Sequence, residues 1–458
     1  MADLSIDFCG IKSPNPFWLA SAPPTNSGHQ IHKAFEAGWG GAVWKTIGAP
    51  VLNVSNRYGT IKYNGQIIGL NNVELISDRP IEINLREIAE IKKLWPDRAV
   101  IASAMVESDP LAWKTIIQQI EDTGADGIEL NYGCPHGMSE RGMGAAVGQV
   151  PEYCEQITAW VREYSSIPVI VKLTPNVTNI SASARAAVAG GAHALSLINT
   201  INSIVGVNLE TFELSPNIGG KGGHGGYAGP AVKPIALHLM SQVALTEEVM
   251  RARLPISGMG GIMNWQDAAE FLLLGASSLQ VCTAAMLYGY RVVEDMIDGL
   301  SNWLDEKGIG SVNEIIGKSL PRISDFGDFD LSFKTVARID HNSCIQCNLC
   351  YIACNDTEHQ CIDLKRGEEL VLPGFAERDN GRIQATSSRP FPVVRESDCV
   401  GCDLCHNVCP VAGCITMVEV PSGRAPTTWR HLSSERPEVT QDWEAMKRYR
   451  AEVGIDIH

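Results

Sequence analysis

The sequence has no apolar run near the roughly 20 residues that span a bilayer. Its first residues lack the basic and apolar segments of a secretory signal. It also lacks clusters of Lys and Arg, since 37 basic residues stand against 52 acidic ones and the net charge is −15. A surface that binds nucleic acid needs clustered positive charge. We therefore expect a cytoplasmic protein whose partners include neither membrane nor nucleic acid.

A dinucleotide-binding fingerprint is absent as well. No Gly-x-Gly-x-x-Gly lies between a predicted strand and a helix with an acidic residue further on. The glycines between Gly219 and Gly229 fall in a predicted long loop and do not fit this pattern. The sequence thus predicts no nicotinamide site of the Rossmann kind.

Cysteine is abundant, but its distribution argues against disulfides. A cytoplasmic chain keeps its thiols reduced, and ten of the 14 cysteines lie between Cys344 and Cys414. Two runs share the spacing C-x-x-C-x-x-C-x-x-x-C, which is typical of a pair of [4Fe–4S] clusters in which the fourth cysteine of each run binds the other cluster. The predicted ligands are Cys344, Cys347, Cys350 and Cys409 for one cluster and Cys354, Cys399, Cys402 and Cys405 for the other.

Zinc is the weaker alternative for these runs, because its sites use pairs of C-x-x-C. Asn355 stands where a proline usually follows the fourth cysteine, whereas Pro410 is present in the second run. Cys361 and Cys414 fall outside the spacing, and we interpret them as buried thiols.

Upstream of the cysteines, apolar strands alternate with amphipathic helices. Asp7 to Phe17 predicts a short hairpin that closes the bottom of a barrel. The predicted strands are 17–22, 41–47, 99–106, 127–134, 168–174, 194–201, 254–259 and 278–284, with helices between them such as 31–37, 113–123, 153–164, 182–189 and 265–274. Eight such repeats in about 300 residues indicate a closed (β/α)₈ TIM barrel of the α/β class.

The domain organisation follows from these patterns. We predict a barrel domain over 1–334 with a linker at about 305–340, and an α+β, ferredoxin-like two-cluster domain over 335–420. Residues 365–395 form a charged, loop-like insertion between the two cysteine runs. Residues 421–458, with Pro421, Pro426 and Pro437, predict an extended tail.

The chain is organised around one cysteine at the end of the fourth barrel strand. The segment from Gly127 to Cys134 predicts a buried strand, and active sites of parallel barrels lie at the carboxyl ends of the strands. Pro135 ends the strand, and glycines at 137, 142 and 144 predict a loop that can close over a substrate. At neutral pH a thiol with a pKa of about 8.5 keeps its proton, so Cys134 could act as a general acid. The alternative is a buried structural thiol.

The two last strands predict a phosphate site. The seventh runs into Ser257-Gly-Met-Gly-Gly-Ile262 and the eighth into Gln280-Val-Cys-Thr-Ala284. Backbone N–H groups in these loops often bind phosphate, and glycine allows a close approach. FMN fits this position, and flavin also converts the single electrons of iron–sulfur clusters into the electron pair that reduces a double bond. A tight turn without a ligand is the alternative.

Several segments together resemble the dihydropyrimidine dehydrogenases. They are Asn131-x-x-Cys-Pro-His-Gly-Met-x-Glu-Arg-Gly-Met-Gly144, Leu19-Ala-Ser-Ala22, Phe35-Glu-Ala-Gly-Trp-Gly40, Lys172-Leu-Thr-Pro-Asn176 and the paired cysteine runs. Specifically, the chain resembles the bacterial NAD-dependent type, in which the half with FMN and iron–sulfur clusters is separate from the half with FAD and NAD. The resemblance implies reduction of uracil and thymine to their 5,6-dihydro forms, with hydride from FMN to C6 and a proton from Cys134 to C5.

The resemblance also implies the remaining site residues. Flavin contacts fall on Ser21, Lys45, Thr46, Lys172, Gly229, Met259, Gly260, Gly261, Cys282 and Thr283, and substrate contacts on Asn72, Asn131, Asn199 and Thr200. Carboxamides supply both donors and acceptors, which suits the alternating C=O and N–H edge of a pyrimidine. Tyr132 and Gly133 are also expected at the substrate, and Gly133 replaces a serine that is usual in the family. The missing hydroxyl could cost about 1–3 kcal/mol of selectivity.

Two other functions stay open at this level. Gly133 leaves room for a related substrate, such as dihydroorotate or another cyclic amide or imide. The barrel could also be catalytically silent in a subunit that only transfers electrons. For partners, the resemblance implies a separate iron–sulfur subunit that binds FAD and NAD(H), and a homodimer core within a heterotetramer.

Overall fold

The computed structural model describes residues 1–48, 58–134, 142–366, 389–421 and 427–452 of the 458-residue chain. The chain divides into two compact units, Met1–Arg322 and Ile323–His458. The division falls inside the segment that was predicted as a linker. Within the described residues, no helix combines the length and apolar character needed to cross a membrane.

The first unit is built on a closed barrel of eight parallel strands, which confirms the predicted (β/α)₈ fold. Around the barrel the order is β10-β15-β16-β3-β4-β7-β8-β9. The strands are β3 (Phe17–Leu19), β4 (Gly41–Ile47), β7 (Ala99–Ala104), β8 (Gly127–Asn131), β9 (Val169–Lys172), β10 (Ala194–Leu197), β15 (Ile256–Gly258) and β16 (Ala276–Val281). Their side chains are almost all buried, as expected of strands covered on both faces. Most end one to four residues earlier than predicted, and residues beyond them, such as Ser21, Cys134 and Thr200, belong to loops at the carboxyl ends of the barrel.

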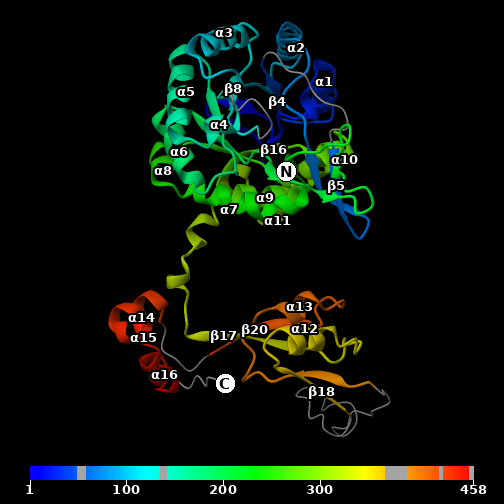
Figure 1. The fold of residues 1–458 in the computed structure, drawn as a ribbon, viewed down its shortest axis with the longest axis vertical. Helices are drawn as coiled ribbons and strands as arrows, with labels where there is room; N and C mark the ends of the chain where they lie inside the picture. Colours follow the sequence, from blue (N-terminus) through cyan, green and yellow to red (C-terminus); the bar gives the residue numbers. More distant parts are fainter. Residues whose placement is uncertain (49–57, 135–141, 367–388, 422–426, 453–458) are drawn as a thin grey trace. The chain divides into compact units, whose positions relative to one another are not determined.

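Helices surround the barrel on its outside (Figure 1). They are α1 (Gly28–Glu36), α2 (Ile81–Leu94), α3 (Pro110–Glu121), α4 (Ala145–Gly148), α5 (Pro151–Tyr164), α6 (Ile180–Ala189), α7 (Lys233–Ala244), α8 (Glu247–Ala252), α9 (Trp265–Leu273), α10 (Thr283–Tyr288) and α11 (Val292–Glu306). Side-chain caps fix several starts. Asp109 accepts a hydrogen bond from the backbone of Ala112, and Asn264 accepts one from Asp267.

The predicted N-terminal hairpin is present as β1 (Ile6–Phe8) and β2 (Ile11–Ser13), which pair antiparallel. Phe8 packs edge-on against Trp18 of β3, with 5.3 Å between ring centroids. The hairpin therefore covers the amino ends of the strands and leaves the carboxyl ends for chemistry.

An antiparallel sheet that the sequence did not predict belongs to loops at the carboxyl ends. Its order is β11-β14-β6-β5, from β5 (Tyr58–Tyr63), β6 (Gln66–Asn72), β11 (Ile201–Ser203) and β14 (Gly225–Ala228). A hairpin of β12 (Gly206–Val207) and β13 (Leu214–Ser215) lies between β11 and β14. Part of the glycine-rich segment 219–229, predicted as loop, is thus strand β14. Glycine suits this strand because the Asn71 side chain and the Thr200 hydroxyl lie where side chains at Gly225 and Gly226 would be.

The second unit contains two strand pairs and two helices around the cysteines. Strand β17 (Phe333–Ile339) pairs with β20 (Ile415–Pro421), and β18 (Ile362–Lys365) pairs with β19 (Phe391–Val394). Helices α12 (Leu349–Thr357) and α13 (Leu404–Asn407) begin one residue before the third cysteine of each run, so Cys350 and Cys405 lie in their first turns. Residues 367–388, the centre of the predicted insertion, lie outside the described residues.

The prediction of an extended tail is wrong for 429–452. This segment forms α14 (Trp429–Glu435), α15 (Pro437–Gln441) and α16 (Trp443–Glu452), and it buries Leu432, Val439 and Ala445. Pro437 misled the prediction because it occupies the first turn of α15, where proline is tolerated. The predicted linker likewise contains short 3₁₀ turns, η4 (Val312–Ile315), η5 (Leu320–Arg322) and η6 (Phe326–Asp328).

Candidate functional site

A cavity of about 1120 Å³, counting its open mouth, lies at the carboxyl ends of the barrel strands. Residues at or after the ends of β3, β4, β8, β9, β10, β15 and β16 line it, and Asn72 of β6 and Tyr227 of β14 contribute from the additional sheet. Loops at this end of parallel barrels carry active sites. The cavity is therefore the candidate active site.

Most of the predicted barrel-site residues line this one cavity. They are Ser21, Lys45, Thr46, Asn72, Asn131, Cys134, Lys172, Asn199, Thr200, Met259, Gly260, Gly261, Cys282 and Thr283. Gly229 is not a lining residue, although its carbonyl lies directly behind Gly261.

Tyr132 is a correction, because it is buried away from the cavity. Its hydroxyl lies 3.2 Å from the Thr158 hydroxyl on α5, and only 1% of the side chain is exposed. Tyr132 adjoins Asn131, which does line the cavity, and neighbouring residues at a strand end point to opposite faces. We conclude that Tyr132 supports the packing of α5 and does not contact a ligand.

Cys134 lies three residues beyond β8 and faces the cavity with 9% of its surface exposed. On its other side it packs with Ile76, Met105 and Met143. Its carbonyl accepts a hydrogen bond from Ala145 N at 3.1 Å, which ties the cysteine to the start of α4. The predicted closing loop falls mostly on 135–141, which lie outside the described residues.

A chain of polar side chains crosses the cavity floor. The Asn199 amide donates to Asn131 Oδ1 at 3.0 Å, and Asn131 donates to Thr46 Oγ1 at 3.0 Å. Asn199 Oδ1 accepts from the backbone N–H of Thr200 at 2.8 Å. These bonds fix which end of each carboxamide is the donor. In the described part of the chain, Asn131 and Asn199 each keep one N–H that can bind a ligand carbonyl.

Gly133 allows this arrangement because a side chain at 133 would collide with Asn199. A Cβ atom there would lie 2.5 Å from Asn199 Nδ2 and 2.6 Å from its Cβ. Gly133 itself does not line the cavity, and its backbone N–H donates to Asn131 Oδ1 at 3.2 Å. The effect of Gly133 on a ligand therefore acts through the position of Asn199.

A Gly133→Ala variant is expected to raise KM for the substrate about tenfold with a smaller change in kcat. The added methyl group displaces Asn199 and misaligns one hydrogen bond, which is worth about 1–3 kcal/mol in a buried site. Steady-state kinetics of Gly133→Ala and Gly133→Ser test this. The serine variant should recover part of the loss by offering a hydroxyl. An unchanged KM in both variants would show that Asn199 is not a substrate contact.

Two buried ion pairs place positive and negative charge together in the cavity. Lys45 Nζ lies 2.5 Å from Glu74 Oε1, and the other Glu74 oxygen accepts from the Tyr58 hydroxyl at 2.9 Å. Lys172 Nζ lies 3.4 Å from Glu129 Oε1 in the barrel interior. Both lysines are at most 6% exposed, so each charge needs its partner.

Sequence reasoning missed both carboxylates, although a signal existed for each. Glu129 precedes Asn131 by two residues in β8, so both point into the barrel. Glu74 stands two residues after Asn72, which would place them on the same side of an extended segment. Glu129 is further held by Ser196 and Gln280, with hydrogen bonds of 2.9 and 2.8 Å to Oε2.

The cavity residues fit FMN at its two ends. Gly260 and Gly261 have φ of +127° and +78°. A Cβ at Gly261 would lie 2.8 Å from Lys233 N and 2.9 Å from the Gly229 carbonyl, so only glycine leaves the backbone open for a phosphate. At the barrel centre, the buried Gln280 Oε1 has no hydrogen-bond partner among the described residues and can accept from a ring N–H.

Cys282 is a second thiol at the cavity, beside the first turn of α10. Burial raises its pKa to about 12, with Glu74 raising it further and the two lysines opposing the shift. The thiol is therefore neutral at physiological pH and lines the cavity as a small apolar side chain.

The predicted cluster ligands gather into two separate cavities of the second unit. Cys354, Cys399, Cys402 and Cys405 line one of about 350 Å³, and Cys344, Cys347, Cys350 and Cys409 line the other of about 310 Å³. Each cavity thus combines three cysteines of one run with the last cysteine of the other, as the spacing predicted. A donor set of four thiols around a closed space suits a [4Fe–4S] cluster.

The backbone follows the same path around both cavities. Gln346 and Asn348 have φ of +58° and +59°, and the equivalent Gly401 and Asp403 have +74° and +65°. Left-handed conformations are uncommon for residues other than glycine. Their repetition shows that the two runs wrap their cavities in the same way.

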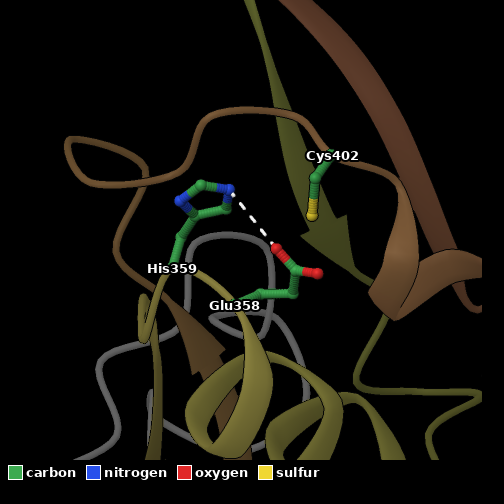
Figure 2. Close-up of side chains that lie close together, drawn as sticks. All are labelled: Glu358, His359 and Cys402. Carbon is green, nitrogen blue, oxygen red and sulfur yellow. Dashed lines mark ion pairs between the residues drawn. The ribbon is translucent and has the colours of Figure 1, made fainter.

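Three exposed side chains lie beside one of these cavities. Figure 2 shows Glu358 and His359 next to Cys402, with His359 Nε2 3.6 Å from Glu358 Oε2. Their possible ligand atoms and the Cys402 sulfur all lie within 4.8 Å of one another. Since Cys402 belongs to the four-thiol set, the trio is the polar outer edge of that cavity and not a separate metal site.

Comparisons with known proteins agree with both units. Residues 3–304 match the family model "Dihydroorotate dehydrogenase", and residues 337–417 match "4Fe-4S dicluster domain". The NAD-dependent dihydropyrimidine dehydrogenase subunit PreA of Escherichia coli K12 is 41% identical over 91% of this chain and 96% of its own. The chloroplastic dihydropyrimidine dehydrogenase (NADP(+)) of Arabidopsis thaliana is 40% identical over 69% of this chain and 77% of its own.

More distant relatives share the barrel. The catalytic subunit of dihydroorotate dehydrogenase B (NAD(+)) from Pyrococcus abyssi is 36% identical over 69% of this chain and 99% of its own. A crystal structure of the Eimeria tenella dihydroorotate dehydrogenase superposes with a TM-score of 0.56 over 69% of this chain and 88% of its own, at 17% identity. That structure shows the shared fold alone. Taken with the cavity and the two thiol sets, the comparisons show that the chain is an oxidoreductase of the dihydropyrimidine dehydrogenase family, with a catalytic barrel of the dihydroorotate dehydrogenase type and a 4Fe–4S dicluster domain.

Proposed function

We propose that the chain reduces the 5,6 double bond of uracil and thymine. The observation that carries this proposal is the pairing of both cavity lysines, Lys45 with Glu74 and Lys172 with Glu129. Orotate differs from uracil by a carboxylate, which needs a cation or several donors when buried. In the described part of the cavity each lysine already has a carboxylate partner, and a second anion would be repelled by Glu74 and Glu129. The neutral pyrimidines fit this electrostatic environment.

The carboxamides supply recognition. Asn72, Asn131 and Asn199 can donate N–H groups to the two carbonyl oxygens of a pyrimidine ring, while Asn72 Oδ1 and Thr200 offer acceptors for its N–H groups. Asn72 is held by a hydrogen bond from its Nδ2 to the Gly226 carbonyl at 3.2 Å. A site built on paired donors and acceptors discriminates strongly against rings that lack them.

Proton delivery is assigned to Cys134. When bound, FMN would supply the hydride for C6 and accept electrons one or two at a time. Cys134 holds the proton for C5 at its sulfur, and its apolar neighbours Ile76, Met105 and Met143 exclude water from that side. Lys172, in its ion pair with Glu129, would contact the flavin ring. Gly260, Gly261 and Thr283 would hold the phosphate end, supported by Gly229 behind Gly261.

Electrons would enter through the second unit. We assign one [4Fe–4S] cluster to Cys344, Cys347, Cys350 and Cys409 and the other to Cys354, Cys399, Cys402 and Cys405. The E. coli relative is named as a subunit, and no dinucleotide fingerprint is found in this sequence, which supports a separate NAD(H)- and FAD-binding partner. A homodimer core within a heterotetramer is part of the same proposal.

Anaerobic mixing of the purified, chemically reduced chain with single pyrimidines tests the function. Uracil and thymine are expected to reoxidise the flavin within seconds, and orotate to do so at least a hundredfold more slowly. NADH alone should not reduce the oxidised chain. Reoxidation by orotate only would assign the barrel to dihydroorotate chemistry, and reduction by NADH alone would refute the separate partner.

A further inference from the structure

Each cluster cavity contains one more buried cysteine than a [4Fe–4S] cluster requires. Cys361 lines the cavity of Cys354, Cys399, Cys402 and Cys405 and is 4% exposed. Cys414 lines the other cavity and is 2% exposed. The spacing places neither in the ligand set, so both thiols need another account.

The two extra thiols have different partners. Cys361 Sγ lies 3.5 Å from Cys354 Sγ, and Cys361 N also donates to that sulfur at 3.4 Å. Its side chain is in hydrogen-bonding reach of Cys399 as well. Cys414 directs its thiol to the backbone carbonyl of Asp340, at 3.6 Å, and is in hydrogen-bonding reach of one ligand sulfur, that of Cys409. Only Cys361 therefore has two cluster-ligand sulfurs as acceptors for its proton.

The surroundings strengthen a hydrogen bond on the Cys361 side. Cys354, Cys399 and Cys405 are each 7% exposed and pack with Val336, Ala337 and Ile362 in one apolar core. The opposite edge, at Cys402, is exposed and carries Glu358 and His359 (Figure 2). A hydrogen bond to a sulfur on the buried, apolar side of the cavity is less screened by solvent than one on the exposed side.

We propose that Cys361 donates an S–H hydrogen bond to the ligand sulfurs of Cys354 and Cys399 and raises the reduction potential of the cluster that they hold. Reduction adds negative charge to the cluster and its sulfurs. A donor aimed at these sulfurs stabilises the reduced state more than the oxidised state. Cys361 is thus a positioning residue for electron transfer and not a fifth ligand.

The test compares Cys361→Ala with Cys414→Ala in the full chain containing both clusters. Anaerobic redox titration followed by electron paramagnetic resonance measures each cluster separately, and iron analysis confirms that both are present. For Cys361→Ala we expect full iron content and a more negative potential for one cluster. The one-electron equilibrium constant should fall by up to about tenfold, which corresponds to about 59 mV. Cys414→Ala, which removes a thiol in reach of only one ligand sulfur and shared with the Asp340 carbonyl, should shift the potential of the other cluster by a clearly smaller amount.

A third variant separates hydrogen bonding from filling of space. Cys361→Ser keeps a donor at the same position and is expected to hold the potential closer to that of the unmodified chain. The proposal is overturned if Cys361→Ala leaves both potentials unchanged, or if serine and alanine produce equal shifts. Loss of one cluster's iron in Cys361→Ala and Cys361→Ser alike would instead identify Cys361 as a ligand. The inference rests on the cluster sites of the proposed function, and its readout does not depend on which pyrimidine reacts.

Discussion

Replacing Cys134 with alanine is expected to lower the rate of uracil reduction by about 10²–10⁴-fold, the usual contribution of a positioned general acid. The cavity keeps its carboxamides and its glycine loop in this variant, so the flavin content and the affinity for uracil should change little. The rate of Cys134→Ser should lie between those of the unmodified chain and Cys134→Ala, because a hydroxyl reaches the same place but is a much weaker acid. Stopped-flow reoxidation of the reduced flavin by uracil measures the effect.

Cys154 provides the matched control for this experiment. It is also a fully buried thiol of the barrel unit, but it lies on α5 and its sulfur contacts the Ser183 carbonyl at 3.7 Å. Cys154→Ala should therefore leave the reoxidation rate within about twofold of the unmodified chain, since it removes volume and no reacting group. A Cys134→Ala variant that reacted as fast as Cys154→Ala would remove the cysteine from the mechanism.

The barrel could be predicted from the sequence because its determinants are local. Each strand is a short apolar run, and each helix repeats apolar residues on one side. The position of Cys134 follows from that pattern, since a residue just after a barrel strand lies at the carboxyl end. The cysteine spacing likewise predicts which four cysteines lie together in each set, because the spacing reflects the geometry of the cluster.

What sequence reasoning could not supply depends on pairing between distant segments. The additional sheet joins β5 and β6 to β11 and β14, more than a hundred residues later, and its strands contain glycines and asparagines that normally indicate turns. Glu74 acquires its role only through this sheet, because it follows β6 and meets Lys45 of β4 and Tyr58 of β5. The prediction that Tyr132 contacts the substrate was wrong for a different reason. Tyr132 is close to Cys134 in sequence, but its side chain points away from the cavity that Cys134 faces.

The ion pairs connect the fold to substrate choice. A buried lysine at the flavin-binding end of a barrel is useful as a cation only if its charge is not cancelled, and Glu74 cancels that of Lys45 at 2.5 Å. Removing one partner of a buried pair leaves an uncompensated charge and costs about 3–5 kcal/mol. We propose that the pair, which is costly to break, also limits which anions can enter the cavity.

Glu74→Gln is therefore expected to lower stability by about 3–5 kcal/mol and to let orotate react. Glutamine preserves a polar group for Tyr58 but removes the carboxylate that pairs with Lys45. A substrate carboxylate at about 4 Å would then gain up to about 4 kcal/mol of attraction at an effective dielectric of 20, much of it offset by desolvation. We expect the rate of orotate relative to uracil to rise by at least about tenfold, and the midpoint of thermal unfolding to fall.

Two comparisons isolate the role of the charge. Glu87→Gln breaks a less buried ion pair, with Arg79, that does not line the cavity, so it should change stability, by a smaller amount, without changing the preference for uracil. In the double variant Lys45→Met with Glu74→Gln the buried charge disappears altogether, so part of the lost stability should return while orotate again fails to react. If orotate reacted equally well with the double variant and with Glu74→Gln, an unpaired Lys45 could not be the cause, and the exclusion of carboxylates would have to arise from the shape of the cavity.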